Sequence, residues 1–89
     1  MIAFGMKVKH RRILEAILVT PTRGGIVFSD IEALVIAIGG DVREGEGPRV
    51  VFELKGSRRY LHRPHPGKEA KKYQVEDLRE WFRQLEVTP

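Results

Sequence analysis

The segment from Gly47 to His65 constrains the fold of this chain most, because it holds two short strands and a stiff exit. From Arg49 to Leu54 every second residue is a large apolar one, the period typical of a half-buried strand. Gly56 lies in the turn that follows, where glycine is free to adopt positive φ. The return strand, Arg58 to His62, carries arginine, tyrosine and histidine. In 63–66 each proline keeps the preceding residue out of the helical region, so we expect an extended exit and a functional site nearby.

A first helix is expected before this hairpin, from His10 to Val19. Its apolar residues Ile13, Leu14 and Ile17 recur at helical spacing. The loop 20–25, which contains proline and two glycines, ends it.

A second helix is expected from Ser29 to Ile38. Ser29 and Glu32 have the spacing of a capping box, in which each side chain accepts a hydrogen bond from the backbone N–H of the other residue. Gly39 and Gly40 end this helix, since a left-handed C-cap favours glycine. The apolar segment 26–28 before it is expected to form either an edge strand or a hydrophobic staple.

Two further elements complete the expected architecture, a short strand at 41–44 and a closing amphipathic helix at 74–85. Three short strands joined by tight turns predict an antiparallel meander. The chain is therefore expected to be one α+β domain over residues 1–89, with a three-stranded antiparallel sheet packed on helices in two layers. Eighty-nine residues are enough for one small core.

The net charge of +4 is unevenly distributed along the sequence. Residues 55–72 contain seven lysines and arginines against one acidic residue, a local charge of +6. Such a basic segment is either a contact surface for the phosphates of a nucleic acid or a solvated surface that keeps the domain soluble.

Other classes of protein are disfavoured by what the sequence lacks. There is no cysteine, which excludes disulfides and thiolate sites. The longest apolar run, 31–38, is too short to span a bilayer, and the N-terminal order of apolar and basic residues is the reverse of a secretory signal. We therefore expect a cytoplasmic protein with no membrane partner.

The chemistry that the residues offer is limited to histidine among basic side chains. No glycine-rich phosphate loop precedes a helix, and no metal site or cofactor is expected, since His62 and His65 have no obvious carboxylate beside them. A histidine near arginine and lysine suits general acid–base catalysis on a phosphodiester, and it equally suits simple phosphate contact.

Several motifs taken together resemble one known family. The order is Ser29–Leu34, the Gly-Gly helix end, a strand, then Gly47-Pro48-Arg49-Val50-Val51-Phe52, followed by Arg58-Arg59, His65 and Gly67-Lys68. This order is similar to that of the HicA toxins, small mRNA interferases of bacterial type II toxin–antitoxin pairs. The resemblance covers Phe28 to the C-terminus. It implies an α-β-β-β-α core similar to a double-stranded-RNA-binding domain (residues 28–89), an additional helix at 10–19, mRNA as ligand and a HicB-like antitoxin as partner.

One position departs from the family pattern. The family motif reads Gly-Ser-His and its histidine is the catalytic residue, whereas this chain has Gly47, Pro48 and Arg49 there. Arginine stays protonated and cannot act as a general base, although it can bind phosphate or stabilise charge in a transition state. The resemblance matches His65 to a histidine common in the family, and His62 is the other candidate for the catalytic base.

Three hypotheses follow from these residues. The first is an mRNA-cleaving toxin in which His65 or His62 moves the proton, and the second is a non-catalytic domain that binds RNA or an acidic antitoxin surface. The third is a structural domain within a larger assembly. In the first two, the expected RNA contacts are basic side chains on and after the hairpin: Arg49, Arg58, Arg59, Arg63, Lys68, Lys71 and Lys72.

Overall fold

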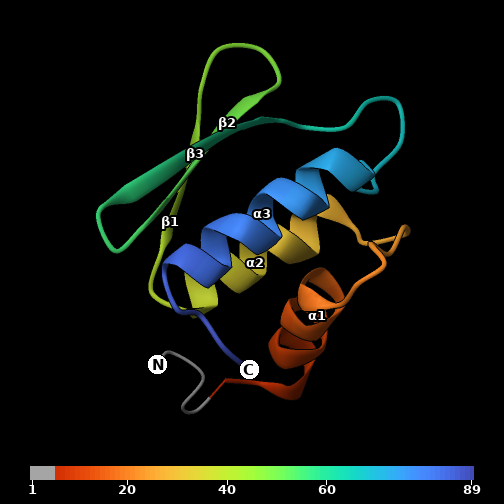
Figure 1. Ribbon diagram of the computed structural model, residues 1–89. Helices are drawn as coiled ribbons and strands as arrows, with labels where there is room; N and C mark the ends of the chain where they lie inside the picture. Colours follow the sequence, from red (N-terminus) through yellow and green to blue (C-terminus); the bar gives the residue numbers. More distant parts are fainter. Residues whose placement is uncertain (1–5) are drawn as a thin grey trace.

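The computed structural model describes residues 6–89, which form three helices and three strands. The elements in chain order are α1 (Val8–Leu18), α2 (Phe28–Ala37), β1 (Asp41–Glu44), β2 (Arg49–Leu54), β3 (Ser57–His62) and α3 (Lys72–Gln84). Figure 1 shows the strands gathered on one side of the molecule and the helices on the other. The expected α+β class is confirmed.

The sheet is an antiparallel meander in the order β1-β2-β3. Its register places Phe52 of β2 between Val42 of β1 and Arg59 of β3. Val50, Phe52 and Leu54 are buried, whereas the alternate residues of β2 are exposed or half-buried. The alternation read from the sequence therefore fixes which face of the sheet packs against the helices.

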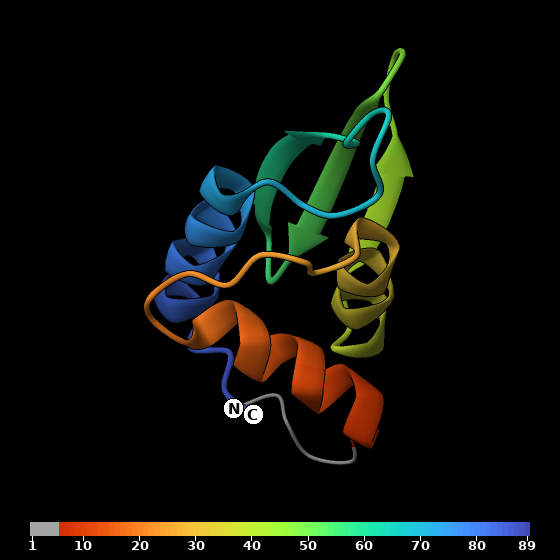
Figure 2. The same cartoon turned by 90° about the vertical axis from the view of Figure 1, so that its right-hand side faces the viewer.

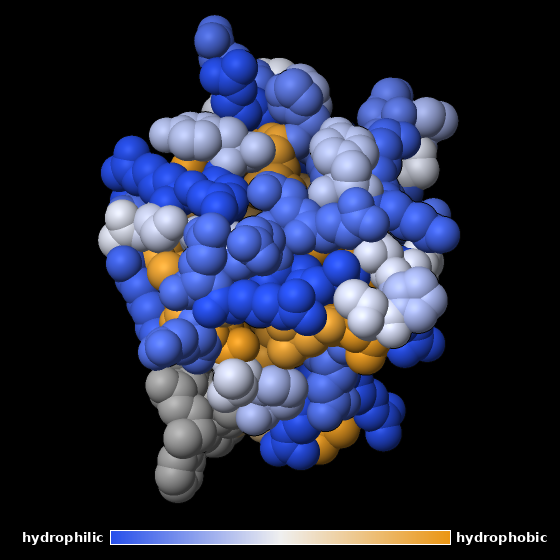
Figure 3. All heavy atoms as spheres, in the orientation of Figure 1, coloured by the Kyte–Doolittle hydropathy of each residue, from blue (hydrophilic) through white to orange (hydrophobic). Residues whose placement is uncertain are grey.

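The core lies between this face and the two helices α2 and α3. The rings of Phe28 and Phe52 have centroids 5.9 Å apart, and Trp81 of α3 is fully buried. The indole N–H of Trp81 donates to the hydroxyl of Ser57 at 2.8 Å, which ties α3 to the start of β3. Figure 3 shows hydrophilic side chains over most of one face of the molecule, with apolar ones between them.

Helix α1 lies on the opposite side of α2 and α3 from the sheet, as Figure 2 shows. Leu14 and Ile17 of α1 are fully buried. The Arg79 side chain of α3, itself only 8% exposed, donates to the carbonyl oxygen of Ile17 at 3.0 Å and to the hydroxyl of Thr22 at 2.6 Å. Because Leu14 and Ile17 are buried and Arg79 donates to a carbonyl oxygen in the last turn of α1, the additional helix is an integral part of the core.

The predicted capping box at Ser29 is wrong. Helix α2 begins one residue earlier, at Phe28, with Val27 as its N-cap, and no side chain caps it. Val27 forms a β-bridge with Glu69, and the backbone N–H of Phe28 donates to the carbonyl oxygen of Lys68 at 2.8 Å. This pairing supplies a partner for the first N–H of the helix, so Ser29 lies within the first turn and is exposed.

The other end of α2 behaves as expected. Gly39 has φ +95°, the left-handed conformation that glycine adopts most easily. Gly40 approaches the sheet so closely that a Cβ atom there would lie 2.7 Å from the carbonyl oxygen of Glu53. Any side chain at Gly40 would separate α2 from β2.

Helix α3 also begins earlier than predicted, at Lys72, and ends at Gln84. The side-chain oxygen of Gln74 accepts a hydrogen bond from the backbone N–H of Lys71 at 2.9 Å, which caps the first turn. At 13 residues it is the longest helix, and none of the helices in residues 6–89 has the length and apolar character needed to cross a membrane.

Candidate nucleic-acid interface

The outer face of the sheet carries the polar residues of the hairpin. Arg49 is the direct partner of His62 across β2 and β3, and Glu53 is the partner of Arg58. Arg49, Glu53 and His62 alternate with buried residues, and Arg58 alternates with half-buried ones, so their side chains project away from the helices. The outer face therefore has two polar ends, one at each end of the β2–β3 ladder.

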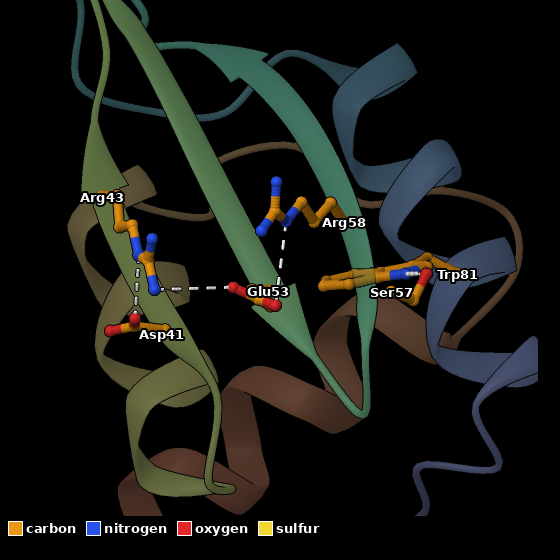
Figure 4. A network of polar contacts seen from close by, with 6 residues as sticks. All are labelled: Asp41, Arg43, Glu53, Ser57, Arg58 and Trp81. Atoms are coloured by element: carbon orange, nitrogen blue, oxygen red, sulfur yellow. Dashed lines mark hydrogen bonds and ion pairs between the residues drawn. The ribbon is translucent and has the colours of Figure 1, made fainter.

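The end near the turn is a network of ion pairs. Figure 4 shows Arg43 of β1 and Arg58 of β3 reaching Glu53 from either side, each at 3.7 Å, while Arg43 also contacts Asp41 at 3.0 Å. Two neighbouring side chains raise the pKa of Arg58 above its usual value: Tyr60 has the larger effect and Glu53 the smaller one. The carboxylate of Glu53 thus offsets the positive charge of Arg58, although the Arg58 side chain is 53% exposed.

The opposite end holds Arg49 and His62, which are both exposed. Among residues 6–89, the Arg49 side chain forms no ion pair or hydrogen bond, unlike the arginines at the other end. A Cβ atom built at Gly45 would lie 3.1 Å from Cβ and Cγ of Arg49, so the loop between β1 and β2 packs against the stem of this arginine. The absence of a side chain at Gly45 leaves room for Arg49 in its observed position.

An open groove of about 700 Å³ runs from this end of the hairpin to the start of α3. We call it the β3–α3 groove. It is lined by residues of β2, β3 and α3: Arg49, Tyr60, Leu61, His62, Tyr73, Gln74 and Asp77.

Two tyrosines in this groove were not among the predicted site residues. Tyr60 is 63% exposed and Tyr73 is 64% exposed. Tyr60 alternates with Arg58 and His62 on β3, and Tyr73 directly follows two lysines. The sequence offered one signal for these residues, namely tyrosines placed next to basic side chains. Only the fold, however, brings the two tyrosines into one groove.

Gln74 fixes the position of the groove walls. Its side-chain nitrogen donates to the carbonyl oxygen of His62 at 2.8 Å, while its oxygen caps α3 at Lys71. Gln74 is only 4% exposed. One side chain therefore joins the end of β3 to the beginning of α3.

Two of the predicted RNA contacts, Arg59 and Arg63, form contacts with other residues of the protein. Arg59 lies 3.6 Å from the carboxylate of Asp77, and its guanidinium carbon lies 5.7 Å from the centre of the Trp81 ring. Arg63 contacts Glu32 at 2.6 Å and Glu44 at 2.8 Å.

Contacts of this kind offset part of the local charge of +6 that residues 55–72 carry in the sequence. Arg58, Arg59 and Arg63 all contact carboxylates that lie outside residues 55–72. The basic segment is therefore far less positive in three dimensions than its sequence indicates. The contact with Arg63 also holds the pKa of Glu44 below its usual value.

The remaining predicted residues lie on the connection between β3 and α3 and at the start of α3. His65 is exposed there and does not line the β3–α3 groove. Lys68 lies where this connection pairs with Val27 and Phe28, and Lys71 and Lys72 are exposed at the start of α3. Of the two candidate histidines, the fold places His62, and not His65, in the groove with Arg49.

Comparison with known proteins identifies one family for this sequence. Residues 28–87 match the family model described as the HicA toxin of bacterial toxin–antitoxin. No curated protein and no solved structure matches the chain. The matched region begins at the first residue of α2 and includes the whole sheet and α3, and it leaves α1 outside. Since it spans more than half of the sequence, the chain belongs to the HicA family of toxins of bacterial toxin–antitoxin systems.

Proposed function

We propose that this protein is the mRNA-cleaving toxin of a type II toxin–antitoxin pair and that it acts on RNA at the β3–α3 groove. The observation that carries the proposal is the direct pairing of Arg49 with His62 at an open end of the sheet. In this proposal the toxin works in the cytoplasm and a HicB-like antitoxin restrains it.

The pairing offers the two groups that RNA cleavage needs. His62, when neutral, accepts the proton of a ribose 2′-hydroxyl, and the resulting oxygen attacks the adjacent phosphorus. The bond from phosphorus to the 5′-oxygen breaks, which leaves a 2′,3′-cyclic phosphate on one fragment. The departing 5′-oxygen takes up a proton from protonated His62 or from water and becomes a 5′-hydroxyl.

Arg49 has the complementary role in this reaction. Its guanidinium is always charged and presents several N–H donors to phosphate oxygens. It therefore stabilises the additional negative charge that develops on the phosphate in the transition state. In this proposal His62 takes over the proton-accepting function of the family's catalytic histidine. His62 is the residue that pairs with Arg49 across the ladder.

The test is cleavage of a long mRNA by the purified full chain and its variants. His62→Ala should abolish cleavage, and Arg49→Gln should reduce it by about a hundredfold or more, as loss of a charge-stabilising donor typically does. His65→Ala is the matched control, because His65 is an exposed histidine outside the groove, and it should retain activity. Full activity in His62→Ala would contradict the proposed base.

The alternative is a non-catalytic toxin-family protein that binds RNA or its antitoxin through the same surface. The observation in its favour is Arg49 itself, which cannot accept a proton. Under this alternative the natural protein binds RNA without cutting it, and Arg49→His gains cleavage.

Under both hypotheses the affinity for RNA should fall steeply as the salt concentration rises. An affinity that does not change with salt would exclude phosphate contacts as the source of binding.

A further inference from the structure

The two tyrosines of the β3–α3 groove differ from every other aromatic residue that the structure describes. Phe28, Phe52, Trp81 and Phe82 are all buried, whereas Tyr60 and Tyr73 expose nearly two thirds of their surface. Large apolar rings are normally removed from water on folding. An exposed ring can be a random feature of a surface, but both exposed tyrosines line one groove.

The charges around these rings favour an anionic ligand. Arg49 and His62 line the same groove, and Arg49 forms no ion pair among residues 6–89. Asp77 is the acidic member of the lining, and Arg59 lies 3.6 Å from its carboxylate, which offsets that charge. A nucleotide carries an anionic phosphate and a flat base on one unit, so it matches the cationic side chain of Arg49 beside exposed rings.

We propose that Tyr60 and Tyr73 form a stacking site for an unpaired RNA base whose neighbouring phosphate contacts Arg49. This inference rests on the proposed function and adds the form of RNA that the groove accepts. A base within a duplex is stacked between its neighbours and cannot lie against a protein ring. The groove should therefore select single-stranded RNA, with little dependence on sequence because every base has a flat face.

Binding is best measured with RNA that cannot be cleaved. A 2′-O-methyl oligonucleotide has no 2′-hydroxyl to attack the phosphate, so affinity is separated from catalysis. Tyr60→Ala and Tyr73→Ala should each weaken binding of this single strand by between about fivefold and a hundredfold, the range for loss of one stacked base. Tyr60→Phe and Tyr73→Phe keep the ring and should bind like the natural protein.

A second probe separates the bases from the phosphates. An abasic oligonucleotide with the same number of phosphates should bind more weakly than the normal strand, and its affinity should not change in the Tyr→Ala variants. Ile36→Ala removes an exposed apolar side chain on α2 and serves as the control for surface truncation. Equal affinity for the abasic and normal strands would overturn the stacking site.

The same variants distinguish failure of this inference from failure of the proposed function. If the Tyr→Ala variants bind normally while Arg49→Gln weakens binding and His62→Ala loses cleavage, the stacking site is wrong and the function stands. If they bind RNA normally but lose affinity for the antitoxin, the tyrosines are part of a protein interface and the inference is also wrong. If neither Arg49→Gln nor the Tyr→Ala variants affect RNA, both proposals fail.

Discussion

Arg79 carries a permanent charge into the interior, where it joins α3 to the end of α1. Its guanidinium donates to the carbonyl oxygen of Ile17 and to the hydroxyl of Thr22, and that hydroxyl in turn donates to Glu76 at 3.1 Å. A buried polar group without partners is costly, and here every buried side-chain nitrogen and oxygen among residues 6–89 has a partner. The charge is tolerated because the end of a helix supplies acceptor oxygens.

Replacing this charge should therefore destabilise the protein. We expect Arg79→Met to lower the free energy of unfolding by about 1.5 to 3 kcal/mol, the range for hydrogen bonds to charged groups. Urea denaturation followed by circular dichroism measures the change. Arg83→Met removes an exposed arginine of the same helix and should have little effect. Equal losses in the two variants would show that the buried contacts of Arg79 contribute nothing.

At the scale of elements, Arg63 joins three segments that are separate in the sequence. It lies just after β3 and contacts Glu32 of α2 and Glu44 of β1. Glu44 is the member whose pKa is lowered, through its hydrogen bond to Arg63 and the attraction between the two charges. The folded state therefore holds a proton on Glu44 less readily than the unfolded chain does. Its contribution to stability is present above the ordinary glutamate pKa of about 4.3 and is lost as the pH falls through the lower folded value.

This linkage predicts a change in the acid sensitivity of the fold. In Glu44→Gln, the drop in melting temperature between pH 7 and pH 3 should be smaller than in the natural protein, because one carboxylate no longer needs to be protonated. Thermal unfolding across this pH range provides the measurement. Glu46→Gln alters an exposed glutamate of the neighbouring loop and is the control. An identical pH dependence in all three proteins would contradict the role of Glu44.

The elements themselves were largely predictable from the sequence. Apolar periodicity located every helix and strand to within about two residues, and the alternation in β2 predicted which of its residues face the helices. The start of α2 was mispredicted because its cap comes from pairing of Val27 with Glu69. A local rule such as the capping box cannot account for a partner so distant in the chain.

The candidate site was less predictable than the fold. The hairpin pattern placed Arg49 and His62 in one segment, but it gave no reason to prefer His62 over His65 before the register was known. The carboxylates that face Arg63 lie 19 and 31 residues away, so the basic segment looked more positive than it is. Tyr73 joins the site only because α3 packs beside β3.

At the scale of the whole molecule, α1 is outside the family match but inside the core. It contacts α2 and α3 on the side away from the sheet, and it leaves the outer face of the sheet uncovered. The part of the chain that matches the family is thus extended by one helix on the side away from the sheet, while the face with Arg49 and His62 stays accessible. An addition of this kind contributes to stability without obstructing the proposed site.

The contribution of α1 can be measured through one buried residue. Leu14→Ala should destabilise the whole domain by about 2 to 5 kcal/mol, because it leaves a cavity between α1 and the other helices. Hydrogen exchange should then show faster exchange in β2 as well as in α1. Val8→Ala, which changes an exposed position of the same helix, should be nearly neutral. Faster exchange confined to α1 would instead mean that this helix unfolds independently.

The two hydrogen bonds of Gln74 have a consequence for how a ligand would bind. Because the cap holds the Gln74 side chain in the first turn of α3, the β3 and α3 walls of the groove cannot separate without breaking its bond to the carbonyl of His62. The groove is therefore already formed before any ligand arrives. Binding then requires little ordering of the protein backbone, so the loss of conformational entropy falls mainly on the ligand. A flexible single strand would lose most of that freedom, whereas a short oligonucleotide with stiffened sugars should bind disproportionately well.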